Sequence, residues 1–230
     1  MFRAYAHTSS QFLPLNGGEG QVVLAFVIDM DGSGKFQPNF NVKGTEISSF
    51  KSNNGNKFKF FLSMGGYSFN LRPDNVPTAV TTLTSLIQNL HIDGIDVYYK
   101  QIDNSDADNF VAVMSSVLKG LKGKIPTLEV SLTVPPPLNR DYYVPLWNSV
   151  KDLIDYVIYQ THSTASRVND VGQLVQIFRQ LDYSGKLLAG HSVLNTDWNT
   201  VPLLVFHGAH PVLLEGNLIS GISEWAASGV

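Results

Sequence analysis

Short runs of apolar residues recur along the chain, separated by stretches whose apolar residues repeat every three or four positions. Eight of these runs are typical of β-strands, and several are almost continuously apolar, as at residues 22–28. Continuous apolar runs are expected for parallel strands that helices cover on the outside. The predicted strands span residues 2–7, 22–30, 58–64, 94–100, 128–134, 153–160, 186–192 and 218–225.

Three of the intervening stretches have the apolar spacing of amphipathic helices. They span residues 74–89, 105–121 and 168–181. Pro77 falls in the first turn of the first helix, where proline is tolerated. Ser105 is expected to cap the second helix, and Gly120 and Gly123 are expected to end it.

Strands that alternate with helices predict an α/β fold with a parallel sheet, and eight such units favour a closed (β/α)8 TIM barrel over an open sheet. The first outer helix is expected to be reduced, because residues 8–21 contain Pro14 and several glycines. A final outer helix is not expected, because few residues follow Trp225. Since neither a repeat nor a linker is found, residues 1–230 are predicted to form a single domain.

Composition excludes several classes of partner. The net charge of −3 and only 16 Lys and Arg residues leave no basic stripe for nucleic acid. No apolar run approaches the roughly 20 residues that span a bilayer, so no membrane partner is expected. The absence of Cys excludes disulfides and cysteine nucleophiles. Without a recognisable signal peptide or N-glycosylation sequon, a cytosolic or storage-compartment location is expected rather than secretion.

Functional groups of such a barrel lie at the C-terminal ends of its strands. The candidate positions are Tyr5, Asp29, Ser63, Gly65, Gly66, Asp96, Tyr98, Lys100, Gln160, His162, His191 and Trp225. Alternation along residues 94–100 should turn Asp96, Tyr98 and Lys100 to one side of the strand. His207 and His210 have the spacing of one helix face, but no Cys or carboxylate stands beside them, so neither a metal site nor a cofactor is expected.

Residues 93–100, DGIDVYYK, resemble the fourth-strand signature of glycoside hydrolase family 18, Asp-Gly-x-Asp-x-Asp-x-Glu, with Tyr98 at the third Asp and Lys100 at the Glu. Residues 58–66, FKFFLSMGG, resemble the family's third-strand Ser-x-Gly-Gly motif. Residues 159–162 are similar to its sixth-strand segment, with His162 in place of a substrate-binding Tyr. Trp225 is similar to the eighth-strand Trp below the sugar. The resemblance covers nearly the whole chain and implies a chitinase-like barrel.

The resemblance implies that Lys100 stands where the family's Glu protonates the leaving oxygen, while the substrate's acetamido group acts as nucleophile. A lysine ammonium is a poor acid for that oxygen, and loss of a general acid costs roughly 10²–10⁴ in rate. Its positive charge would also repel the developing oxocarbenium ion. For two positive charges 4 Å apart in an effective dielectric near 20, this repulsion costs about 4 kcal/mol. The degenerate motif Asp93, Asp96, Tyr98 and Lys100 therefore predicts no hydrolysis. Glu224, beside an inward Trp225, is expected to face the other way.

Structural roles are expected for several of these residues. Lys100 is predicted to form an ion pair with Asp96, and Asp93 to be a turn residue before Gly94. Trp225 is expected either to pack at the barrel mouth or to stack on a sugar. Tyr159 and His162 are expected to be structural.

Within the family, residues 2–5 and the altered fourth strand resemble the narbonin group of plant seed proteins. The resemblance implies a catalytically inactive storage or defence-related protein, and the 17 Asn and 9 Gln are consistent with nitrogen storage. One alternative is a lectin for chitin or N-acetylglucosamine oligomers, and another is an inhibitor that binds a target glycosidase. The expected carbohydrate cleft comprises Tyr5, Asp96, Tyr98, Gln160, His162 and Trp225.

Overall fold

The computed structural model describes residues 1–12, 19–66, 68–102, 106–136, 140–162, 168–181, 183, 186–192 and 200–225. Its strands are β1 (Phe2–Ala6), β2 (Gly20–Ile28), β3 (Gln37–Pro38), β4 (Phe58–Gly65), β5 (Gly94–Tyr98), β6 (Glu129–Val134), β7 (Tyr156–Gln160), β8 (Leu187–Ser192) and β9 (Gly221–Trp225). Its α-helices are α1 (Gly44–Asn53), α2 (Val76–Asn89), α3 (Ala107–Lys124), α4 (Arg140–Val150), α5 (Val171–Arg179) and α6 (Leu203–Glu215).

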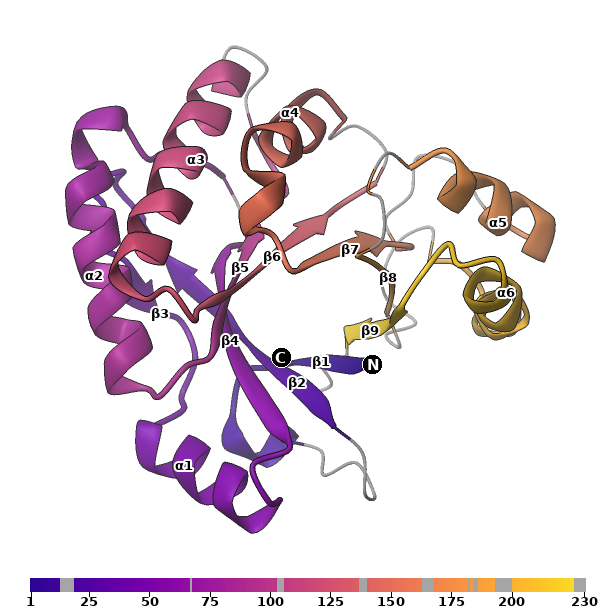
Figure 1. Cartoon of the computed structure of the whole chain (residues 1–230), viewed down its shortest axis with the longest axis horizontal. Coiled ribbons are helices and arrows are strands. Elements are labelled where there is room, and N and C mark those ends of the chain that lie inside the picture. Colours follow the sequence, from indigo (N-terminus) through magenta and orange to yellow (C-terminus); the bar gives the residue numbers. More distant parts are fainter. Residues whose placement is uncertain are drawn as a thin grey trace.

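Eight parallel strands form a closed barrel, with the helices arranged around its outside (Figure 1). The sheet order is β1-β9-β8-β7-β6-β5-β4-β2, and the pairing of β1 with β2 closes the ring. The short β3 adds an antiparallel edge at the end of β2, which the sequence did not predict. The predicted (β/α)8 barrel is confirmed, and all eight predicted strands are present with shifted ends.

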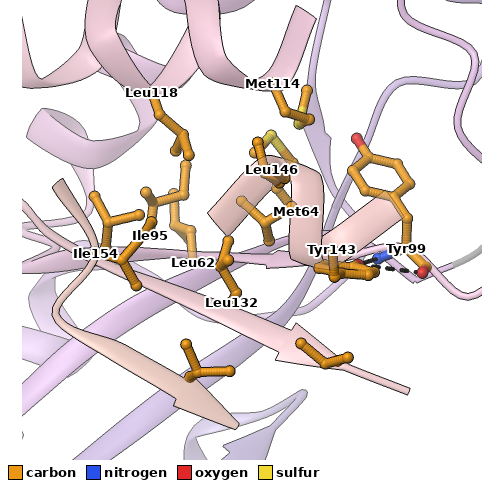
Figure 2. Close-up of a cluster of buried hydrophobic side chains, with 14 of the residues drawn as sticks. Leu62, Met64, Ile95, Tyr99, Met114, Leu118, Leu132, Tyr143, Leu146 and Ile154 are labelled. Atoms are coloured by element: carbon orange, nitrogen blue, oxygen red, sulfur yellow. Dashed lines mark hydrogen bonds between the residues drawn. The ribbon is translucent and has the colours of Figure 1, made fainter. Parts of the chain in front are cut away.

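Outward side chains of the strands pack under the helices and form the main core. Figure 2 shows this layer where β4, β5 and β6 meet α3 and α4. Each such large apolar side chain contributes roughly 1.5–3 kcal/mol through burial. The core residues labelled there are Leu62, Met64, Ile95, Tyr99, Met114, Leu118, Leu132, Tyr143, Leu146 and Ile154.

A buried tyrosine pair fixes α4 to the end of β5. The Tyr99 amide donates to the Tyr143 hydroxyl at 2.7 Å, and that hydroxyl donates to the Tyr99 carbonyl at 3.2 Å. Burial raises the pKa of Tyr143 well above its usual value. Tyr99 therefore faces outward, which leaves its neighbour Tyr98 facing the barrel interior.

The helices differ from the predictions at their ends. Pro77 lies in the first turn of α2, as predicted. The prediction that Gly120 and Gly123 end a helix is wrong, because α3 runs through both to Lys124. A Cβ on Gly120 would lie 2.7 Å from Val80 Cγ2, so this glycine lets α2 and α3 approach closely.

Two predictions about helices depend on residues that are not described. Of the described residues between β1 and β2, only Ser9–Gln11 form a helical turn, while residues 13–18 and the predicted cap Ser105 lie outside the described residues. The predicted absence of a final outer helix concerns residues 226–230, which also lie outside them. In the described part of the chain, no helix has the length and apolar character needed to cross a membrane.

Candidate functional site

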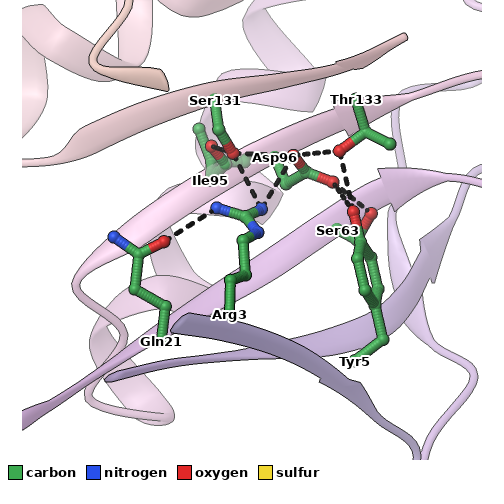
Figure 3. Close-up of polar contacts among 8 residues, drawn as sticks. All are labelled: Arg3, Tyr5, Gln21, Ser63, Ile95, Asp96, Ser131 and Thr133. Atoms are coloured by element: carbon green, nitrogen blue, oxygen red, sulfur yellow. Dashed lines mark hydrogen bonds and ion pairs between the residues drawn. The ribbon is translucent and has the colours of Figure 1, made fainter. Parts of the chain in front are cut away.

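Asp96 of β5 lies at the centre of a polar network inside the barrel (Figure 3). Its Oδ1 forms an ion pair with Arg3 Nη2 at 2.9 Å. The same oxygen accepts hydrogen bonds from Ser131 Oγ at 2.6 Å and Thr133 Oγ1 at 2.9 Å. All four side chains are buried, because alternation along β1, β5 and β6 turns them inward.

The second oxygen of Asp96 is engaged as well. Oδ2 accepts from Ser63 Oγ at 2.8 Å and from the Tyr5 hydroxyl at 3.2 Å, and that hydroxyl lies 2.7 Å from Thr133 Oγ1. A carboxylate offers about four lone-pair sites. Since protein donors occupy these directions, Asp96 stabilises the barrel interior rather than presenting a free oxygen.

Arg3, which the sequence analysis did not select, is the cation that pairs with Asp96. It is fully buried, donates to Gln21 Oε1 at 3.0 Å and to Ser131 Oγ at 2.9 Å, and lies 4.7 Å from the Phe61 ring centre. The prediction that Lys100 pairs with Asp96 is therefore wrong. The Arg3 side chain points from β1 into the barrel interior, where it meets Asp96, whereas Lys100 follows the end of β5 and is exposed.

An aromatic layer lies beside this network, toward the C-terminal ends of the strands. Tyr98 is fully buried, with its ring 5.5 Å from Phe26, 6.2 Å from Trp225 and 6.5 Å from Tyr5. Trp225 is half-buried and also packs against Phe26 and Tyr5, with centroids 5.9 and 4.7 Å apart. Burial, followed by the nearby Asp96 charge, raises the pKa of Tyr5 well above its usual value.

Lys100 is exposed at the rim of the barrel. Its Nζ lies 5.7 Å from the centre of the Tyr98 ring, so the two side chains lie on the same side of the strand, as alternation predicts. A cation over an aromatic face at an exposed site contributes about 0.5–1 kcal/mol. Lys100 thus lies at the outer edge of the aromatic layer, near the buried Tyr98 ring.

The two glycines at the C-terminal end of β4 permit close contact with β5 and the aromatic layer. Gly65 and Gly66 have φ values of 118° and 89°, which favour glycine. The Gly66 amide donates to the Tyr98 carbonyl at 2.6 Å. A Cβ on Gly65 would lie 2.3 Å from that carbonyl oxygen, and one on Gly66 would lie 2.8 Å from the Phe26 ring. The glycines selected from the sequence therefore position Tyr98.

Other candidates lie elsewhere on the barrel. Gln160 and His162 are buried at the end of β7, two strands from β5 in the sheet order. Tyr159 faces outward and packs against Phe178 of α5, in agreement with its predicted structural role. Asp93 lies before β5, where it accepts from the Phe60 amide at 2.7 Å and pairs with Lys51 at 2.6 Å.

His191 and Glu224 face away from the barrel interior, toward α6. The His191 ring stacks on Phe206 at 4.5 Å, and its register partner across β9 is Glu224. Burial raises the pKa of Glu224, and the nearby His207 opposes this rise. Glu224 therefore faces away from Trp225, as predicted. Among the described residues, no group of three or more His, Cys, Asp or Glu could hold a metal ion.

Protonation of His191 is expected to destabilise the fold. Burial, followed by the His207 charge, lowers the pKa of His191 to about 4 from 6.5. Since the unfolded chain binds the proton more readily, stability should fall as the pH drops from 6.5 to 4. Between pH 7 and 4.5, the free energy of urea unfolding should fall by about 2 kcal/mol more in the wild type than in His191→Phe. Equal losses in both proteins would contradict this assignment.

The sequence contains a signal for the orientation of the residues that the sequence analysis missed, but not for their contacts with Asp96. Arg3 interrupts an apolar strand two positions before Tyr5, and Ser131 and Thr133 are two positions apart, so alternation marks them as inward polar residues. Their convergence on Asp96 comes from barrel closure. It brings together residues separated by as many as 128 positions in the chain.

Comparison with known families gives one match that covers most of the chain. The model of glycosyl hydrolases family 18 matches residues 4–202. The RuBisCO-associated protein of Glycine max is 28% identical over 99% of this chain and 92% of that protein. Chitinase 1 of Tulipa saxatilis subsp. bakeri is 26% identical over 89% of this chain and 71% of its own length.

Solved structures give the same architecture. A family 18 chitinase from Crocus vernus is 25% identical and superposes with a TM-score of 0.84, covering 98% of this chain and 92% of its own. The catalytic domain of a family GH18 chitinase from the fern Peteris ryukyuensis superposes with a TM-score of 0.86 over 98% and 91% of the two chains. At 23% identity, this second likeness bears on the fold alone.

Proposed function

The chain belongs to glycosyl hydrolases family 18, and from that membership we propose that it is a chitinase-like plant protein that does not hydrolyse chitin. Its role is then storage or defence, as in the narbonin group that its first and fourth strands resemble. The single observation that carries the proposal is the pair of side chains at the end of β5, where Tyr98 is buried and Lys100 is a cation.

Glycoside hydrolysis requires an acid that protonates the leaving oxygen, usually with a second carboxylate nearby. At the positions that the family motif gives to acids, this chain has the Tyr98 phenol and the Lys100 ammonium. The phenol ring also packs against Phe26 and against Trp225, the residue that the family resemblance places below the sugar. Both features support inactivity.

Three other acids on or beside the barrel strands are poorly placed to compensate. Asp96 is neutralised by Arg3 and accepts hydrogen bonds from its other neighbours. Asp93 lies at the opposite end of β5, paired with Lys51. Glu224 faces outward toward α6. These placements support the proposal that no substitute pair performs the reaction.

A non-enzymatic role is also consistent with one relative. The soybean protein that aligns with 99% of this chain is named for association with RuBisCO rather than for hydrolysis. The side-chain amides of 17 Asn and 9 Gln would supply nitrogen on degradation. Storage therefore requires only a stable barrel and no open site.

A lectin is the second candidate, and Trp225 is the observation that favours it. Trp225 is half-buried, so part of the residue is accessible beside Tyr5 and Tyr98. A Trp ring contributes to ligand binding by burying its apolar face, while its polar N–H group can remain hydrogen-bonded to water. A sugar ring could use the accessible part of Trp225 without any catalytic acid.

Calorimetric titration with an N-acetylglucosamine hexamer distinguishes the two roles. If the protein is for storage, we expect no saturable heat, which corresponds to a dissociation constant weaker than about 1 mM. Micromolar binding that disappears in Trp225→Ala but persists in Leu204→Ala would contradict the storage role and establish the lectin. Leu204 is a suitable control because it is 87% exposed on α6.

A further inference from the structure

Helix α6 carries most of the large apolar side chains that the described residues expose to solvent. Of the six such side chains, only Met1 and Met30 lie elsewhere. A cluster of exposed apolar side chains on a soluble protein marks an interaction site more often than single ones do. The four on α6 are Leu203, Leu204, Val212 and Leu214, which are 51, 87, 43 and 38% exposed.

The outer faces of other helices in the ring are polar, in contrast to that of α6. In α2, Thr81, Ser85 and Gln88 are exposed at successive helical turns. In α3, Ser116 and Lys119 are exposed in the same way. A surface helix normally has such a polar face, whereas a helix that is apolar on all sides is normally covered. The sequence of α6 therefore indicates that another apolar surface covers its outer face.

Four exposed residues form a stripe along one side of α6, opposite the side that packs on the barrel. Their spacing of three or four positions places them one above the other on the helix surface. The residues of this α6 stripe are Leu204, His207, Pro211 and Leu214. The buried residues on the barrel side are Phe206, Ala209 and Leu213.

One flank of α6 is covered by a helix and the other is open. α5 covers the first flank, where a Cβ on Gly208 would lie 3.0 Å from Val171 Cγ2. No described helix covers the second flank, because α6 is the last helix in the arc around the barrel (Figure 1). The α6 stripe therefore has no helical neighbour among the described residues.

The charges at the two ends of α6 are not those that its dipole favours. Pro202 precedes the helix without a capping side chain, and the first turn contains no acid. The last turn contains no base and ends at the exposed Glu215. A helix dipole favours negative charge at the N-terminus and positive charge at the C-terminus. An antiparallel copy of the same helix would place its own Glu215 beside the uncapped N-terminus.

We propose that the outer face of α6 is the contact surface between two copies of this chain, with the two α6 helices packed antiparallel about a two-fold axis. Such a contact uses the same patch on both copies and closes at the dimer. It pairs Leu204 of each copy with Leu214 of the other and brings each Glu215 to the other helix N-terminus. This surface is separate from the barrel interior and from the proposed lack of hydrolysis.

A second copy fits this face better than a lipid surface does. Helices that lie on membranes usually have Lys and Arg on their polar face, which attract anionic lipids. α6 contains neither, and Glu215 is its only residue with a formal charge at neutral pH. Two copies of an uncharged stripe meet without like-charge repulsion.

The size of the face sets the expected strength of the dimer. α6 has 13 residues, and a helix of that length is about 20 Å long and 10–12 Å wide. One such face per copy lies at the low end of interface sizes, where association is weak and transient. We therefore expect a reversible dimer with a dissociation constant of about 10⁻⁵–10⁻⁴ M.

Sedimentation velocity of the full chain from about 5 µM to 1 mM tests the dimer, because this range extends to both sides of the expected dissociation constant. The mean mass should rise from 25.3 kDa toward twice that value. Leu204→Glu should weaken the dimer at least tenfold, because it places a carboxylate in the apolar contact. Its fold should be intact, since Leu204 is exposed and an acid suits the first turn. The matched control Ala112→Glu adds the same side chain at an exposed position of α3 and should dimerise as the wild type does.

Glu215→Gln separates the dimer contact from the stability of the helix itself. The dimer should weaken by about three- to tenfold, because both contacts between a carboxylate and a helix N-terminus are lost. The melting temperature of the monomer should not fall, because the change removes a negative charge from the C-terminus of its own helix. A purely structural role of Glu215 predicts the reverse pattern.

Three results would overturn the proposal. The first is a mass that stays at the monomer value up to about 1 mM, ten times the weakest expected dissociation constant. The second is dimerisation of equal strength in the wild type and in Leu204→Glu. The third is binding of a monomer to phosphatidylcholine vesicles that Leu204→Glu abolishes, which would assign the face to a lipid surface.

Discussion

Replacing Asp96 with alanine is expected to lower the free energy of unfolding by about 3–5 kcal/mol, because it leaves the Arg3 guanidinium buried without its carboxylate. The donors Ser63, Ser131 and Thr133 lose their common acceptor in the same step. For a domain of this size, each kcal/mol lowers the melting temperature by about 2–4 °C. The loss should therefore be about 6–20 °C by thermal unfolding.

A double-mutant cycle measures the interaction energy between Arg3 and Asp96 separately from their contacts with other residues. Arg3→Met alone should also be destabilising, because it leaves the Asp96 charge buried. Arg3→Met combined with Asp96→Ala should cost clearly less than the sum of the two single changes, since neither charge is then left unpaired. Asp108→Ala, at an exposed position, should change stability by no more than about 0.5 kcal/mol. A loss below about 1 kcal/mol in Asp96→Ala would contradict the assigned role of the pair.

Converting Tyr98 to Asp and Lys100 to Glu together is expected to produce chitooligosaccharide hydrolysis at least about a hundredfold above the wild-type background. A positioned general acid contributes roughly 10²–10⁴ in rate, and the change also removes a cation from beside the developing positive charge. Shortening Tyr98 additionally opens space against Phe26 and Trp225. Release of a fluorescent aglycone measures the gain.

The single variants provide the matched controls. Lys100→Glu alone should gain less than the double variant, because the Tyr98 ring still fills the space beside Trp225. Tyr98→Asp alone should stay at background, because no proton donor is restored. If the double variant folds and shows no more turnover than the wild type, these two positions do not account for the lack of hydrolysis that we propose.

Alternation along single strands predicted much of the site. It placed Asp96 and Tyr98 on the same face of β5 and turned Glu224 away from Trp225. These features depend on residues one to four positions apart in the chain. The period of a strand is therefore sufficient to predict them.

The partner of Asp96 could not be predicted in the same way. Arg3 and Asp96 meet across the barrel interior, and the sheet order, the register and the closure of β1 on β2 bring them together. The sequence analysis chose Lys100, which is close in the chain but exposed at the rim. Gly120 was misinterpreted for a related reason. The sequence around Gly120 does not show that this residue packs against Val80 of α2.

Hydrolysis by the unmodified protein is the most direct test of the proposed inactivity. A fluorogenic chitooligosaccharide should be incubated with the wild type, a boiled sample and the double variant Tyr98→Asp with Lys100→Glu, from about pH 4 to pH 8, a range that covers the usual titration of Glu and His. We predict that the wild type releases no more product than the boiled sample at any pH. Wild-type turnover above the boiled sample at any pH would contradict the account.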